Sequence, residues 1–158
     1  MGSWKQWGRA ALTAAALAVV LDLLGAGRIQ VTAYALSCPG LPEAFSGLKI
    51  ALITDLHGAF LEDGGQTLAR AAAGADLIAI SGDLFDRDTH LEQVIPAIRS
   101  LCRMAPVYYV SGNHEWTVEG RREVWAQMEE AGAILLDHRW VTLERQGASI
   151  TLAGIQDP

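Results

Sequence analysis

Three apolar runs, each followed at once by a polar cluster, constrain the fold of this chain more than any other feature. The apolar runs cover residues 48–53, 77–80 and 107–110. The polar clusters that follow them are Asp55-Leu56-His57, Gly82-Asp83-Leu84-Phe85-Asp86 and Gly112-Asn113-His114-Glu115. The clusters recur about every 30 residues, which is the length of a strand, helix, strand unit. The pattern predicts an α/β fold in which the chain returns three times to one edge of a parallel sheet.

The chemistry of the clusters indicates one half of a metal site at that edge, where ligands bind in open α/β sheets. Asp55 and His57 lie two residues apart at a strand end and offer one oxygen and one nitrogen to a cation. Taken alone, this pair is better explained by a turn-forming Asp beside an incidental His. Gly82 lets the backbone approach closely, and the two oxygens of Asp83 can bridge two metals. Asn113 adds a neutral amide oxygen.

Hydrophobic spacing and turn signals predict the other elements. Helices are expected over residues 66–73, 89–103 and 118–131. In the second of these, Thr89 is the expected N-cap, and Pro96 is expected to kink or split the helix. Further strands are expected over residues 28–36, 134–136, 140–143 and 150–153. Gln146-Gly147 is the expected turn of a closing hairpin.

Net charge and cysteine content exclude several classes of protein. The chain of 158 residues fits one domain, and its net charge of −6 argues against a surface that coats nucleic acid, which needs clustered positive charge. Cys38 and Cys102 are too far apart for a zinc knuckle or a disulfide framework, and Cys102 is expected to be buried. His90 and His138 stand outside the clusters and are expected to be solvated.

The N-terminal segment has the layout of a targeting sequence. Lys5 and Arg9 precede a mostly apolar stretch over residues 10–24, which ends in small residues. Residues 1–27 are therefore predicted to be a signal peptide or a membrane anchor, with the rest of the chain on the extracytoplasmic side. The stretch is shorter than the roughly 20 residues that span a bilayer comfortably, so cleavage stays open. The alternative is a buried helix of the domain, which the lack of a polar face disfavours.

The segments ITDLHG, SGDLFDR and SGNHEW resemble, in this order and spacing, the first three sequence blocks of the calcineurin-like metallophosphoesterases. The closest likeness is to the bacterial membrane-associated branch, and it covers residues 28–158. The resemblance implies the N-terminal part of a four-layer α/β/β/α sandwich, preceded by a hydrophobic signal or anchor helix. It also implies hydrolysis of a phosphomonoester or phosphodiester by metal-activated water.

The resemblance assigns a role to six residues of the clusters. The metal ligands that it implies are Asp55, His57, Asp83 and Asn113. Asp83 would bridge two divalent ions, and the mixed oxygen and nitrogen ligands suit Mn, Fe or Zn. His114 would contact the reacting phosphoryl group or protonate the leaving oxygen, oriented by Asp86.

The family pattern continues with a further His and a Gly-His-x-His block, which this sequence does not contain. We therefore expect residues 28–158 to be the N-terminal part of a longer enzyme that alone binds metal weakly, turns over little and leaves an apolar sheet face uncovered. The alternative is a non-catalytic protein that keeps the fold. A nucleotide-binding domain is disfavoured because no Gly-rich phosphate loop follows the first strand. The membrane segment suggests a phospholipid or lipid-linked substrate, and the oligomeric state stays open.

Overall fold

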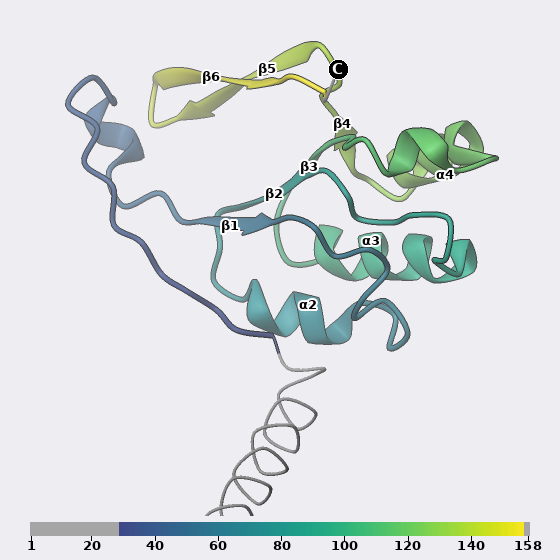
Figure 1. Ribbon diagram of the computed structural model, residues 1–158. Helices are drawn as coiled ribbons and strands as arrows, with labels where there is room; N and C mark the ends of the chain where they lie inside the picture. Colours follow the sequence, from purple (N-terminus) through teal and green to yellow (C-terminus); the bar gives the residue numbers. More distant parts are fainter. Residues whose placement is uncertain (1–28, 157–158) are drawn as a thin grey trace, which may run out of the picture. The chain divides into compact units, whose positions relative to one another are not determined.

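A parallel sheet with helices on one face and a β-hairpin on the other forms the structure, a computed structural model that describes residues 29–156 (Figure 1). The strands are β1 (Ile50–Ile53), β2 (Leu77–Ser81), β3 (Val107–Val110), β4 (Ile134–Leu135), β5 (Arg139–Arg145) and β6 (Ala148–Gly154). The α-helices are α2 (Gln66–Ala71), α3 (Val94–Cys102) and α4 (Arg121–Glu130). Short 3-10 helices are η1 (Glu43–Phe45), η2 (Leu91–Gln93) and η3 (Glu115–Thr117).

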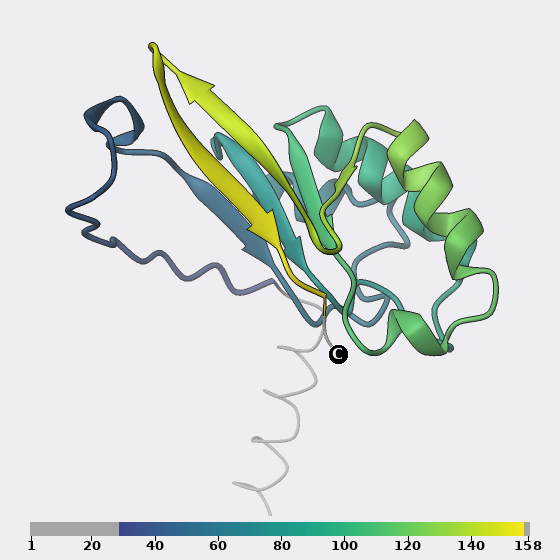
Figure 2. The same ribbon diagram turned by 90° about the horizontal axis from the view of Figure 1, so that it is seen from above.

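The order of the strands explains why the helices share one face. The sheet runs β1-β2-β3-β4 with every pair parallel, so the chain adds each strand on the same side of the last. Because crossovers between parallel strands are right-handed, this order sends α2, α3 and α4 to one face, as Figures 1 and 2 show. The register pairs Ile53 with Ile80 and Ser81 with Val110, so β1, β2 and β3 end at one edge. The predicted return of the three clusters to that edge is confirmed.

Alternation along the strands divides their side chains between two cores. On the helical face, strand and helix side chains that are at most 2% exposed pack the main core: Ile78, Ile80, Val107, Tyr109, Ile98, Leu101 and Met128. On the opposite face, Leu77, Tyr108 and Leu136 form a smaller cluster. Val141, Leu143 and Leu152 of the hairpin pack against this cluster. The hairpin is therefore a third layer over the sheet.

The hairpin turn falls where the sequence predicts it. β5 and β6 pair antiparallel from Arg139 opposite Gly154 to Arg145 opposite Ala148. Gln146 and Gly147 connect them with φ values of 51° and 80°. Two successive residues with positive φ match the right-handed twist of the flanking strands, which is why such turns close tight hairpins.

Part of the hairpin-side sheet face is uncovered in the described residues. Ile50 and Leu52 of the edge strand β1 are 54% and 66% exposed. Their partners across the register, Leu77 and Ala79, belong to or pack against the cluster beneath the hairpin. Residues 29–156 thus form three layers (helices, parallel sheet and hairpin) of the expected four, with the apolar face over β1 left bare as expected.

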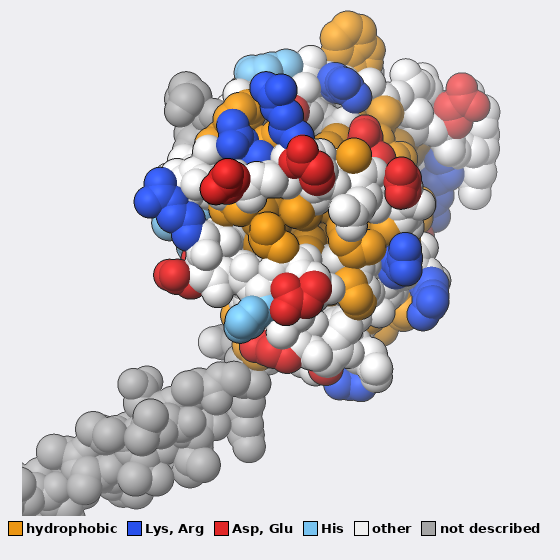
Figure 3. Space-filling model, turned by 90° about the vertical axis from the view of Figure 1, so that its right-hand side faces the viewer, with side chains coloured by type: hydrophobic (Ala, Val, Ile, Leu, Met, Phe, Trp, Pro, Cys, Tyr) orange, Lys and Arg blue, Asp and Glu red, His pale blue; other side chains and the backbone are white. Residues whose placement is uncertain are grey.

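Charged side chains of both signs border apolar ones on the face of the molecule drawn in Figure 3. Both acidic and basic groups lie around a central apolar area there.

Among the described residues, no helix is long and apolar enough to cross a membrane. The predicted signal or anchor segment, residues 1–27, lies outside the described part of the chain.

The strand predicted over residues 28–36 is wrong for the part that the structure describes. Residues 29–36 form no strand, and Val31, Tyr34 and Leu36 are 66%, 83% and 92% exposed. Alternating apolar residues give a segment one apolar face, but a strand also needs a neighbour that accepts and donates backbone hydrogen bonds. No strand of the described residues supplies that neighbour to this segment.

The helix predicted over residues 89–103 is also corrected. The chain forms η2 and then α3, which begins at Val94. The hydroxyl of Thr89 donates to Asp86 Oδ1 at 2.9 Å and accepts the Asp86 N–H at 3.0 Å, so it braces a loop and caps no helix. Pro96 lies in the first turn of α3, where backbone N–H groups have no partner within the helix. Its missing N–H therefore removes no hydrogen bond of α3.

The two cysteines and the two histidines outside the clusters differ in exposure. Cys38 is exposed and Cys102 half-buried, and burial raises the pKa of the Cys102 thiol. The half-burial of Cys102 falls short of the full burial that was expected. His90 and His138 are exposed, as predicted.

Candidate metal centre

Backbone hydrogen bonds join the first two clusters at the ends of β1 and β2. The Asp55 N–H donates to the Gly82 carbonyl at 3.3 Å, and the His57 N–H donates to the Asp83 carbonyl at 2.9 Å. These bonds continue the pairing of the parallel strands into the loops that follow them. The predicted ligands of the two clusters are therefore held on neighbouring stretches of backbone.

Three of the four predicted metal ligands have left-handed backbone conformations. Asp55, His57 and Asp83 have φ values of 54°, 48° and 52°. This conformation costs an L residue other than Gly roughly 1–2 kcal/mol, and such conformations concentrate at functional sites. Their coincidence at three candidate ligands supports a site whose side-chain directions are imposed by the surrounding fold.

The second and third clusters approach each other through two glycines. A Cβ atom added to Gly82 would lie 2.8 Å from both the Cα and the N of Gly112. A Cβ atom added to Gly112 would collide with the Asp83 carboxylate. Only glycine at both positions allows this contact, and it brings Asp83 and Asn113 onto adjoining loops.

One ligand group joins the first two clusters. Asp55, His57 and Asp83 each offer a ligand atom, and these atoms lie within 4.8 Å of one another. The Thr54 hydroxyl donates to Asp55 Oδ2 at 2.7 Å, and the His114 N–H donates to Asp83 Oδ1 at 3.0 Å, which holds both carboxylates. Two carboxylate oxygens and an imidazole nitrogen, with no thiolate, fit a divalent cation such as Mn, Fe or Zn.

Asn113 and Asp83 line the same hollow. An open hollow of about 360 Å³ is lined by Ser81, Asp83, Val110, Ser111, Gly112, Asn113, Ile155 and Gln156. Asp83 thus belongs both to the ligand group and to the hollow that Asn113 lines. A carboxylate in this position can contribute one oxygen to each of two neighbouring ions.

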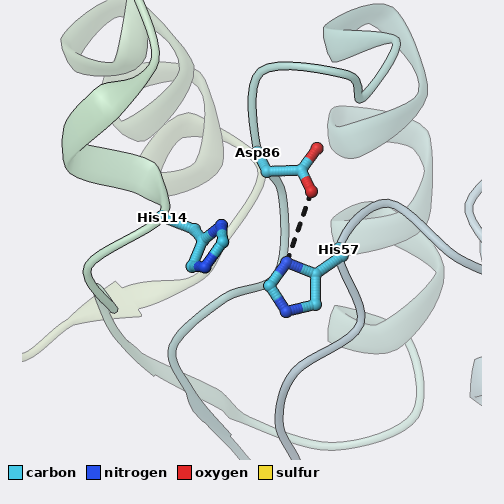
Figure 4. Close-up of side chains that lie close together, drawn as sticks. All are labelled: His57, Asp86 and His114. Carbon is cyan, nitrogen blue, oxygen red and sulfur yellow. Dashed lines mark ion pairs between the residues drawn. The ribbon is translucent and has the colours of Figure 1, made fainter.

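His114 and Asp86 form a second group with His57 (Figure 4). The three side chains come from three different loops and point toward one another. Asp86 Oδ2 lies 3.3 Å from His57 Nδ1, and the rings of His57 and His114 meet edge to face with centroids 4.5 Å apart. The sequence-based expectation paired Asp86 with His114, whereas the ion pair in the structure joins Asp86 to His57.

The pKa of the Asp86 carboxylate is lowered by its own loop and by His57. Partial burial acts to raise its pKa, but the Thr89 hydroxyl, the Asp88 N–H and the neighbouring His57 together outweigh burial and leave the pKa below its ordinary value. Both donors bind Oδ1, at 2.9 Å and 3.0 Å. The other oxygen is thereby directed at His57, where it can fix the orientation of the imidazole, as carboxylates do for metal-binding histidines.

A network at the end of β3 fixes the start of the third cluster. Ser111 donates its N–H to Asp137 Oδ1 and its hydroxyl to Asp137 Oδ2, both at 2.8 Å. The indole N–H of Trp116 donates to the Ser111 hydroxyl at 3.1 Å. These bonds hold the strand end from which Asn113 and His114 follow.

Sequence reasoning gave no role to Glu115, which the structure makes conspicuous. Its side chain is 0% exposed, and its carboxylate accepts backbone N–H groups of the second and third clusters. Burial raises its pKa, against the opposing effect of these N–H donors. The available signal was an acidic residue inside a cluster, but glutamate is rarely buried and sequence alone gives no ground to expect it.

Comparisons with known proteins show the family of this chain. The chain matches a family model described as calcineurin-like phosphoesterase over residues 48–157. It is 28% identical over 125 residues to the uncharacterized metallophosphoesterase YkoQ of Bacillus subtilis (strain 168), covering 75% of this chain and 46% of that protein. It is 29% identical over 172 residues to a Danio rerio transmembrane protein with metallophosphoesterase domain, covering 99% of this chain and 38% of that protein.

Among solved structures, the phosphopantetheinyl hydrolase PptH of Mycobacterium tuberculosis aligns with a TM-score of 0.49 at 20% identity, over 68% of this chain and 43% of that one. The chain spans less than half the length of the curated relatives it matches. The family match covers all three clusters and the sheet that carries them. The chain therefore belongs to the calcineurin-like phosphoesterase family.

Proposed function

We propose that this chain carries metal ligands of a phosphoesterase that hydrolyses a phosphomonoester or phosphodiester at a centre of two divalent ions. The observation that carries the proposal is the ligand group of Asp55, His57 and Asp83, whose ligand atoms lie within 4.8 Å of one another. The group stands at the carboxyl edge of a parallel sheet, where α/β proteins bind ligands. Family membership supplies the reaction class.

In this proposal Asp55 and His57 hold one ion, Asp83 is shared, and Asn113 holds the second. Divalent ions at such a centre lower the pKa of a bound water and neutralise phosphate oxygens. Asp86 orients the His57 imidazole through the 3.3 Å contact. The carboxylate of Asp83 is kept in place by the His114 N–H at 3.0 Å.

His114 is proposed to act on the substrate. Its ring meets the His57 ring edge to face, and its side chain is exposed. From this place it would contact the reacting phosphoryl group or give a proton to the leaving oxygen. His114 is not proposed as a ligand of the first ion, although its ring contacts the ring of the ligand His57.

A lipid-linked phosphate at a membrane surface is the substrate class that we propose. The support is the apolar N-terminal segment of the sequence and the printed name of one relative, a transmembrane protein with this domain. On the same grounds we propose that the domain lies on the extracytoplasmic side.

Removing the metal is expected to abolish hydrolysis by the whole protein. The assay compares p-nitrophenyl phosphate with bis(p-nitrophenyl) phosphate before chelation by EDTA, after chelation, and after addition of Mn²⁺, Fe²⁺ or Zn²⁺. We expect the rate to fall to background with EDTA and to return with at least one of these ions, and the preferred ester to define the substrate class. Hydrolysis that survives complete chelation would contradict the proposal. Metal binding without hydrolysis of any phosphoester would favour the non-catalytic alternative.

A further inference from the structure

Glu115 is a carboxylate enclosed by the protein beside the candidate metal centre. Its side chain is 0% exposed, and it starts η3 directly after His114. A buried carboxylate is unfavourable unless its oxygens are hydrogen-bonded. Each Glu115 oxygen accepts two backbone N–H groups, so the carboxylate is fully engaged by the fold.

The four donors come from the second and third clusters. Oε1 accepts the N–H groups of Leu84 at 2.6 Å and Phe85 at 3.3 Å. Oε2 accepts the N–H groups of Asp83 and Gly112, each at 3.0 Å. One side chain therefore fixes the backbone at a candidate bridging ligand and at the residue before Asn113.

The first cluster is attached to the same backbone. The carbonyl of Asp83 accepts the His57 N–H, and the carbonyl of Leu84 accepts the Gly58 N–H, each at 2.9 Å. Two peptide groups whose N–H donates to Glu115 thus accept, through their carbonyls, the N–H groups of His57 and of Gly58, the residue after the first cluster. Hydrogen bonds run without a break from Glu115 to the backbone of His57.

We propose that Glu115 is a positioning residue of the metal centre: it clamps the loops of all three clusters and thereby sets the direction of the Asp83 carboxylate. Asp83 has a φ of 52°, a strained conformation that its surroundings must impose. Glu115 itself touches neither metal nor substrate, because both of its oxygens are engaged by peptide N–H groups. The inference rests on the proposed function, since it gives the clamp a metal to position.

The test is Mn²⁺ binding by the whole protein carrying Glu115→Gln, measured by isothermal titration at a temperature where circular dichroism shows the native state. The amide keeps the volume of the side chain but turns an NH₂ group toward two N–H donors, so the clamp opens on one side. We expect the dissociation constant for Mn²⁺ to rise at least about tenfold, as it does when supporting partners of metal ligands are changed. Glu119→Gln, which removes the same charge from an exposed side chain four residues on, should bind as the unchanged chain does.

A residue that served stability alone would lower the melting temperature of Glu115→Gln and leave the Mn²⁺ affinity of the folded protein unchanged, which would overturn the proposal. If Glu115→Gln does not fold, hydrogen exchange of the unchanged chain decides. Binding and clamping are reciprocal, so Mn²⁺ should slow exchange of the amides of residues 83–85 and 112. Mn²⁺ binding that leaves their exchange unchanged would also overturn it. Absence of Mn²⁺ binding by the unchanged whole protein is a separate result, which counts against the proposed function itself.

Discussion

Replacing Asp83 with Asn is expected to reduce hydrolysis by the whole protein to the background rate. Asp83 is shared between the ligand group with Asp55 and His57 and the hollow lined by Asn113. The substitution preserves volume but removes the charge and one of the two oxygens with which a carboxylate can bridge two ions. We also expect Mn²⁺ affinity to fall by at least about 100-fold, the upper end of the effect of changing a supporting partner.

A matched substitution separates this effect from a general loss of negative charge. Asp88 is exposed and lies five residues further along the same loop. Asp88→Asn should leave both the rate and the Mn²⁺ affinity unchanged. Hydrolysis by Asp83→Asn at the rate of the unchanged protein would contradict the bridging role, and equal losses in both variants would show that the charge of the loop matters more than one ligand.

Replacing His114 with Ala is expected to lower kcat by about 10²–10⁴-fold and to leave Mn²⁺ affinity little changed. Removing a group that transfers a proton in the transition state costs a factor of this size. The rings of His114 and His57 are in contact, with centroids 4.5 Å apart, so the two substitutions compare different roles of neighbouring imidazoles. His57→Ala should instead lose Mn²⁺ binding and rate together, since His57 belongs to the ligand group.

His90→Ala provides the control for both histidine variants. His90 is exposed and lies outside the three clusters, and its Nδ1 atom is 3.6 Å from Glu92 Oε1. We expect it to behave as the unchanged protein. Steady-state kinetics at saturating Mn²⁺ and titration of the metal-free protein give the two readouts. A parallel loss of Mn²⁺ affinity and kcat in His114→Ala would contradict the division of roles and make His114 a ligand.

Much of the fold follows from patterns that local physics controls. Apolar runs of strand length, spaced by about 30 residues, predict the parallel strands β1, β2 and β3 because this spacing is the length of a strand, helix, strand unit. Gln146-Gly147 predicts its turn because Gly147 adopts the required positive φ without a steric penalty. The strand expected over residues 28–36 fails because strand formation depends on a partner elsewhere, which the segment's own alternation does not specify.

The candidate site divides in the same way. The convergence of Asp55, His57 and Asp83 is predictable, because strand ends of a parallel sheet share one edge. The contact of Asp86 with His57 depends on how Thr89 and the Asp88 N–H occupy the other oxygen, which is a matter of loop geometry. The burial of Glu115 depends on four peptide groups from two loops, and no local pattern encodes that meeting.

The central claim, that the three clusters form one metal centre, is tested most directly by the imidazole NMR signals of the protein's four histidines during addition of Mn²⁺. A bound paramagnetic ion broadens the signals of nearby nuclei. His57 lies in both groups and His114 in the second, whereas His90 and His138 are exposed and belong to neither group. We predict that His57 and His114 broaden at the lowest Mn²⁺ concentrations while His90 and His138 stay sharp. Equal broadening of all four, or earlier broadening of His90 or His138, would contradict the account.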